Sequence, residues 1–66
     1  MEYTNSQIRE LLAEYIHRER DRAMVARRLI DGITFEKLAE EFDLSVRQTK
    51  TIVHKNEGIL FKHIKI

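Results

Sequence analysis

Apolar residues recur at intervals of three and four along the chain, which predicts short amphipathic helices separated by polar breaks. The first expected helix covers about 6–17 and begins at an N-cap supplied by Asn5 or Ser6. Its apolar face consists of Ile8, Leu11, Leu12, Tyr15 and Ile16. The residues 17–22 are all polar, so we expect a bend or break near 17–19, with one continuous helix as the alternative.

A second helix is expected over about 19–31, followed by Gly32 as a left-handed C-terminal stop. Its buried face is expected to comprise Ala23, Ala26, Leu29 and Ile30, with Met24 or Val25 at the margin. Thr34 fits the N-cap of a third helix over 35–42, in whose first turn the helix dipole favours Glu36. That helix should bury Phe35, Leu38, Ala39 and Phe42.

Residues 43–45 form a short connector, and Ser45 followed by Gln48 fits a capping box for a fourth helix beginning at Val46. Its inner face would hold Thr49, Ile52 and Val53. Its outer face would hold Arg47, Gln48, Lys50, Thr51, His54 and Lys55. Gly58 should interrupt or bend this helix. The apolar tail 59–64 is expected to form a last short helix packed on the first two, although its composition would also suit a strand.

The pattern and the composition together predict one small all-α domain over 1–66, a bundle of four to five helices. The 66 residues are 42% hydrophobic and 35% charged, which suits a folded domain. Because cysteine is absent, disulfides and thiolate zinc sites are excluded. No apolar run approaches the roughly 20 residues of a membrane helix, and residues 1–5 do not resemble a secretory signal. We therefore expect a cytoplasmic protein.

The net charge of +1 conceals a strong asymmetry along the chain. Residues 1–44 carry seven Lys/Arg and ten Asp/Glu, a net charge of −3, whereas residues 45–66 carry five Lys/Arg and one glutamate, a net charge of +4. This division indicates a basic face directed at an anionic partner. The alternative interpretation is a solvated helix face that carries several lysines.

Residues 35–54 have the layout of a helix-turn-helix. Ala39 supplies the small side chain that two closely crossing helices need, and Ile52 anchors the second helix to the core. Leu38, Phe42 and Leu44 form the apolar cluster beneath the crossing. The outward positions that remain are long, polar and poor in acid, as a helix entering the major groove requires.

Residues 34–45 (TFEKLAEEFDLS) and 49–55 (TKTIVHK) resemble region 4 of bacterial sigma factors, in particular the short sigma-like proteins of phages and mobile elements. The upstream residues 19–33 are similar to the helix and glycine that precede the motif in that family. The resemblance covers about 19–64. It implies a transcription regulator whose second motif helix reads a promoter hexamer in the major groove of double-stranded DNA.

Two positions depart from the family pattern. The turn usually carries glycine where this chain has Asp43, which tolerates the left-handed conformation better than most residues. The recognition helix usually carries valine or isoleucine where this chain has Thr49, whose hydroxyl can bond back to a carbonyl of its own helix. The sigma regions that bind core polymerase and melt the promoter are missing, so we do not expect a complete sigma factor.

Carried over by position, the resemblance implies that the residues facing DNA are Arg47, Gln48, Lys50, Thr51 and His54. Arginine can grip guanine O6 and N7, and glutamine can pair with adenine N6 and N7. Lys50 and Lys55 suit phosphates, with Thr34 and Lys37 as further backbone contacts from the preceding helix. The alternative is that these side chains only solvate an exposed helix.

Catalytic and metal chemistry is not expected, and neither is a cofactor. His17, His54 and His63 lack a metal-ligand spacing, and Ser45 has no nearby His-Asp partner. The adjacent Glu40 and Glu41 point to different faces of a helix, and the two glycines of the chain form no phosphate loop. The pair Arg27–Arg28 could touch phosphate, but we interpret it as a solvated face.

So small a reader neutralises few phosphates, so its affinity as a monomer should be weak and salt-dependent. We therefore expect either a homodimer on paired half-sites or binding alongside RNA polymerase. Leu12, Tyr15, Ile16 and the apolar tail would form the self-association surface, or else the closing layer of the core. The rival hypothesis is a protein-interaction module whose basic C-terminal face docks an acidic surface of RNA polymerase or another regulator.

Overall fold

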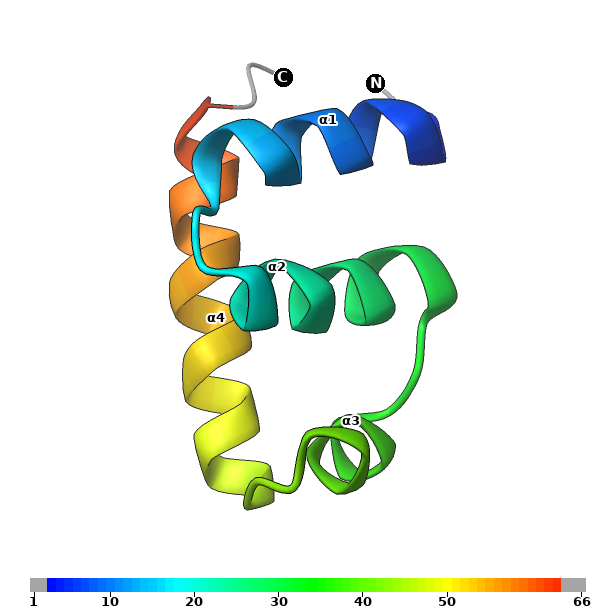
Figure 1. Ribbon diagram of the computed structural model, residues 1–66, viewed down its shortest axis with the longest axis vertical. Coiled ribbons are helices and arrows are strands. Elements are labelled where there is room, and N and C mark those ends of the chain that lie inside the picture. The colour runs from blue at the N-terminus through cyan, green and yellow to red at the C-terminus, as the bar shows by residue number, and fades with distance from the viewer. Residues whose placement is uncertain (1–2, 64–66) are drawn as a thin grey trace.

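The computed structural model describes residues 3–63, and these form four α-helices and no strand (Figure 1). The predicted all-α class is therefore confirmed, at the lower of the two expected helix numbers. The helices are α1 (Asn5–Tyr15), α2 (Glu19–Ala26), α3 (Phe35–Phe42) and α4 (Val46–His63), and a π-helical turn η1 (Arg27–Asp31) continues α2. Within the described residues, none of these helices combines the length and the apolar character needed to cross a bilayer.

Helix α4 runs along the length of the molecule, and α1, α2 and α3 follow one another down one side of it (Figure 1). Helix α2 packs against both α1 and α4, and η1 reaches α3. The central position of α2 divides the interior into two apolar clusters. One consists of Leu12, Ile16, Val25 and Leu60, and the other of Met24, Leu38 and Val53.

The predicted buried face of the second helix is wrong in part, although Ala26 and Leu29 do pack against the first apolar cluster. Ala23 is exposed, whereas Met24 and Val25, which we placed at the margin, are fully buried. Because α1 and α4 both pack on α2, two consecutive side chains find apolar neighbours, one in each cluster. The last turn of the predicted segment is also not α-helical, since Arg27–Asp31 forms the wider π turn before Gly32.

Helix α1 begins earlier than predicted, because Thr4 is its N-cap rather than Asn5 or Ser6. The Thr4 hydroxyl accepts a hydrogen bond from the Gln7 backbone N–H at 3.2 Å, and the Gln7 side chain accepts one from the Thr4 N–H at 2.8 Å. This reciprocal pair is a capping box, which satisfies two free N–H groups at once. The helix ends at Tyr15, so the predicted break before the second helix is confirmed.

The sequence left two roles open for the apolar residues of the first helix, namely self-association or closing the core. Leu12 and Ile16 are buried within the single chain, where they contact Val25 and Leu60, so they close the core and are not free for self-association. Tyr15 is half-buried, and its ring stacks on His63 with centroids 3.9 Å apart and planes within 3°. This contact joins the ends of α1 and α4.

The connections around α3 follow the sequence prediction. Gly32 adopts the left-handed conformation with φ 68°, and Thr34 caps α3 by accepting from the Lys37 N–H at 3.2 Å. Asp43 also adopts it, with φ 56°, and thus takes the place that glycine usually fills in such turns. Ser45 and Gln48 form the expected capping box, and α4 begins at Val46.

The predicted interruption at Gly58 is wrong, because α4 continues through it to His63. Residues 59–63 are therefore the end of α4 and not a separate helix, and residue 64 lies outside the described residues. A helical glycine costs roughly 0.5–1 kcal/mol relative to alanine. Full burial of a leucine contributes about 1.5–3 kcal/mol, so the burial of Leu60 offsets that cost.

The two glycines give a matched test of this fold. Gly58→Ala should raise the free energy of unfolding by about 0.5–1 kcal/mol, because its position is helical and no atom lies within 4 Å of an added Cβ. Gly32→Ala should lower it by about 1–2 kcal/mol, because φ 68° strains an alanine even in open space. Urea unfolding measures both. A loss of stability for Gly58→Ala would contradict the continuous α4.

Candidate nucleic-acid interface

The outward face of the first ten residues of α4 is polar and without acid. All six residues predicted to face outward are exposed, namely Arg47, Gln48, Lys50, Thr51, His54 and Lys55. The inward face is anchored in the core, since Thr49 and Val53 are fully buried and Ile52 packs beside them. The hydroxyl of Thr49 donates to the Ser45 carbonyl oxygen at 2.9 Å, so the buried polar group is satisfied as predicted.

Two outward side chains already make hydrogen bonds within the chain. The amide oxygen of Gln48 accepts from the Ser45 N–H at 3.1 Å and from the Ser45 hydroxyl at 3.2 Å. A bidentate contact to adenine needs that oxygen, so Gln48 would have to leave the capping box to make it. The hydroxyl of Thr51 donates to the Arg47 carbonyl at 3.0 Å, which leaves its oxygen free to accept. Of the two side chains predicted to contact bases, Arg47 therefore has the less competition from hydrogen bonds within the chain.

The aromatic ring of Phe35, at the start of α3, is surrounded by basic side chains. The guanidinium carbon of Arg28 lies 4.4 Å from the ring centroid, and Nζ of Lys50 lies 5.7 Å from it. The ring of His54 is also close, with centroids 5.6 Å apart. Phe35 is half-buried rather than buried as predicted, because its outer side forms this contact surface. Cations over an aromatic face are attracted to its negative quadrupole, so the ring holds the basic groups near the start of α3.

Arg28 is a member of the candidate site that the sequence analysis missed. It was interpreted as part of a solvated face, yet it is half-buried and donates to the Ile33 carbonyl at 2.7 Å. The sequence contained no local signal for this placement. Arg28 reaches Phe35 only because the π turn and Gly32 reverse the chain between them.

Arg27, its neighbour, has a different environment. Its Nε donates to Glu41 at 3.1 Å and its Nη1 to Asp31 at 2.8 Å. These hydrogen bonds, to Glu41 first and then Asp31, raise the pKa of the Arg27 guanidinium above its usual value. Its charge is thus matched by two carboxylates, which makes it a poor anion ligand beside the less encumbered Arg28.

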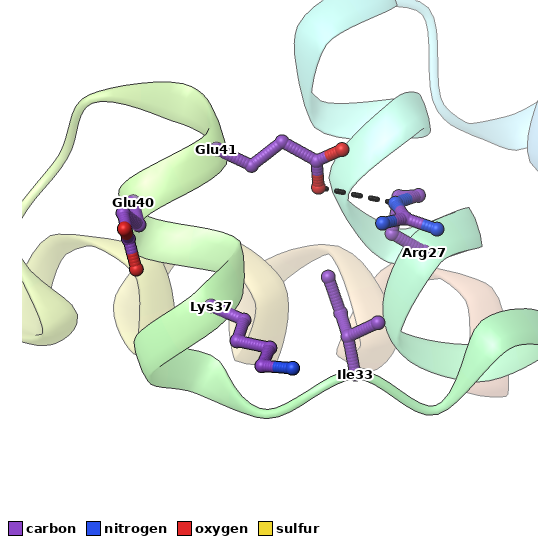
Figure 2. A pocket seen from close by; sticks show the side chains of 5 residues that line it. All are labelled: Arg27, Ile33, Lys37, Glu40 and Glu41. Carbon is purple, nitrogen blue, oxygen red and sulfur yellow. Dashed lines mark hydrogen bonds and ion pairs between the residues drawn. The ribbon is translucent and has the colours of Figure 1, made fainter.

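Figure 2 shows the Arg27–Glu41 pair at the edge of a hollow of about 510 Å³ between η1 and α3. Lys37 and Ile33 line the same hollow, together with Glu40. None of the six outward residues of α4 lines it, so Lys37 is not brought together with them. The carboxylates of Glu40 and Glu41 in this hollow disfavour a bound phosphate, so Lys37 is poorly placed to contact one. Thr34, by contrast, directly precedes Phe35 in the sequence.

Toward the C-terminal end of α4, the outward face is bounded by one acidic residue, Glu57. Nδ1 of His54 lies 3.5 Å from Oε1 of Glu57, which is half-buried. Lys55 is exposed on the adjacent part of the helix surface. Among residues 3–63, no three His, Cys, Asp or Glu side chains are grouped as a metal site would need.

The chain matches no protein-family model, and neither a curated protein nor a solved structure matches it. The site must therefore be judged from its own geometry. That geometry brings together Arg28, Phe35, Lys50 and His54 at one edge of α4 and Arg47 and Thr51 on its outer surface.

Proposed function

We propose that the protein binds double-stranded DNA with sequence preference, using α3, the turn 43–45 and α4 as a helix-turn-helix and α4 as the helix in the major groove. The observation that carries the proposal is the acid-free outward face of α4 next to the basic cluster around Phe35. The resemblance to sigma region 4 in the same residues supports a role in transcription regulation.

The proposed contacts fall into two classes, because base contacts specify sequence and phosphate contacts position the protein. Arg47 projects from the exposed first turn of α4 and is assigned to a base edge. Lys50 and Arg28 flank Phe35 and are assigned to phosphates, with Thr34 beside them. His54 and Lys55 extend the same face toward the end of the interface.

A single copy of this interface offers few cations, so its affinity should be weak and should depend on salt. We propose that a second interaction supplements it, either a second copy on a paired half-site or RNA polymerase bound nearby. A protein with this role would act in the cytoplasm, on the nucleoid.

The two adjacent arginines provide a matched test of the proposal. Using a duplex selected from a random pool, Arg28→Ala should weaken binding similarly for all sequences and make the salt slope shallower by about 1. Arg27→Ala removes the same charge, but it should change affinity less than about twofold, because Glu41 and Asp31 already pair with Arg27. Fluorescence anisotropy at two salt concentrations measures both, and urea unfolding checks that each variant is folded.

Equal losses for the two variants would show that only net charge matters and would contradict the assigned role of Arg28. Failure of the wild-type protein to bind any selected duplex would overturn the DNA proposal altogether. The rival protein-interaction module would then be the better account of the basic face.

A further inference from the structure

The edge of α4 that faces away from Phe35 carries a second surface with a different character. Leu44 and Ile52 lie on the floor of a hollow of about 390 Å³, and Ile59 continues the same edge seven residues beyond Ile52. Residues seven apart lie close to one line along a helix, because two turns take about 7.2 residues. Leu44, Ile52 and Ile59 are called the apolar stripe below.

The apolar stripe is only partly covered by the rest of the chain. Ile59 is 37% exposed, and Leu44 and Ile52 are half-buried at the margin of the core cluster. Ile59 is therefore the exposed member of the apolar stripe, and Leu44 and Ile52 extend it as a half-buried apolar margin that a partner would cover further. Phe61, which is 53% exposed, lies on the other edge of α4, about 160° around the axis from Ile59.

The surroundings of the apolar stripe are basic. Arg20, Arg47, Gln48 and Thr51 line the hollow around Leu44 and Ile52, and the last three of these four also belong to the outward face of α4. Lys55 lies three residues after Ile52 and four before Ile59, and Lys62 lies three after Ile59, so both are its neighbours on the helix surface. Glu57, the single acidic residue of α4, lies about 160° around the axis from Ile59.

Arg20 is held in place by a buried polar link between α2 and α4. Its Nε and Nη2 donate to Oδ1 of Asp21 at 3.2 and 3.1 Å. The other oxygen of Asp21 accepts from Nδ2 of Asn56 at 3.2 Å, and Asn56, which is 6% exposed, also donates to the Ile52 carbonyl at 2.8 Å. The charge of Arg20 is thus matched by the Asp21 carboxylate, and the positive charge available beside the apolar stripe comes from Lys55 and Lys62.

We propose that the apolar stripe binds an acidic amphipathic helix of a partner protein. The apolar side chains of such a helix would fill the hollow and cover Ile59, and its carboxylates would face Lys55 and Lys62. A helix seated in an apolar groove with complementary charges at the rim is a general mode of peptide recognition. The hollow shares Arg47, Gln48 and Thr51 with the outward face of α4, so the partner helix and a DNA duplex would compete for this surface, whereas binding of the partner helix does not itself require DNA.

The test uses a designed, fluorescently labelled peptide of about 18 residues, or about five helical turns, with leucines on one face and glutamates on the others. Its control has the same composition with the leucines scattered around the helix. Anisotropy should show at least about tenfold tighter binding of the amphipathic peptide, because only that peptide can bury its leucines together. Equal affinity of the two peptides would reduce the interaction to general charge attraction and overturn the proposal.

A pair of variants locates the bound peptide. Ile59→Gln should weaken binding about tenfold, whereas Phe61→Gln, a change at a more exposed side chain on the other edge of α4, should change it less than about twofold. An equal or larger loss with Phe61→Gln would place the peptide elsewhere and contradict the assignment. Sedimentation velocity of the protein alone gives the remaining outcome, since self-association that Ile59→Gln abolishes would assign the apolar stripe to a second copy and overturn the proposal.

Discussion

Leu38→Ala is expected to lower the free energy of unfolding by about 2–5 kcal/mol, the largest effect of any single change considered for this protein. Leu38 is fully buried and packs with Met24 and Val53, so it joins α3 to both α2 and α4. The loss combines the lost transfer of the side chain from water with the cavity left behind. A domain of this size has a total stability of only about 3–10 kcal/mol, so the variant should lose a large fraction of it.

The control for this change is Ile59→Ala, which deletes the same number of carbons from a side chain that is 37% exposed. It should cost less than about 1 kcal/mol, because little buried surface is lost and alanine favours the helix. Urea unfolding followed by circular dichroism measures both variants. A Leu38→Ala protein as stable as Ile59→Ala would contradict the close packing of α3 against α4.

Arg47→Ala is expected to weaken binding to the selected duplex by about 10–100-fold and to relax the preference for one base pair of the site. The physical reason is the loss of a bidentate contact to a base edge, which is worth about 1–3 kcal/mol of discrimination. Gln48→Ala should have the smaller effect on DNA affinity, because its amide oxygen already accepts two hydrogen bonds from Ser45. It should instead lower stability by about 0.5–2 kcal/mol through the loss of the capping box.

Arg9→Ala is the control for Arg47→Ala, since Arg9 is an exposed arginine of α1. Its loss should change affinity less than about threefold by the general charge effect alone. Anisotropy against the selected duplex and against single-base variants of it separates affinity from specificity. If Arg47→Ala and Arg9→Ala bind all these duplexes equally well, Arg47 makes no base contact.

The region from Thr34 to Val46 could be predicted almost to the residue, because its signals are local. Thr34 and Ser45 are recognisable caps, and each bonds to a backbone N–H three residues ahead. The turn residue Asp43 is one of the few non-glycine types that adopt the left-handed conformation readily. Local signals of this kind depend on neighbours within one turn and are therefore visible in the sequence.

The features that could not be predicted depend on distant neighbours. Met24 and Val25 are both buried because α2 lies between α1 and α3 and packs on α4, so that each of the two side chains enters one of the two apolar clusters (Figure 1). No periodicity within α2 reveals that arrangement. Gly58 is helical because Leu60 packs against Leu12 in the first helix. The cap of α1 is different, since the spacing of Thr4 and Gln7 matched a capping box and could have been recognised.

In the candidate site too, features set by local signals could be predicted from the sequence, and features that depend on distant neighbours could not. The outward position of Arg47 and its neighbours follows from the phase of α4, which its capped start and buried Thr49 define. The contribution of Arg28 could not be predicted in this way, because it depends on the π turn and on the place of Phe35 at the start of the next helix. The sequence likewise gives no reason to assign different roles to the adjacent Arg27 and Arg28, because the two differ only in the partners that the fold provides.

The central claim is that α4 and the start of α3 form the surface that binds DNA. The most direct measurement is a titration of the ¹⁵N-labelled protein with the selected duplex, followed residue by residue by NMR. The predicted result is that backbone amide signals change around Arg47, Lys50 and His54 and also at Thr34 and Arg28, while those of Arg9 and Ile59 stay nearly unchanged. Changes concentrated on α1 or along Ile59, or no change at any ratio of duplex to protein, would contradict the account.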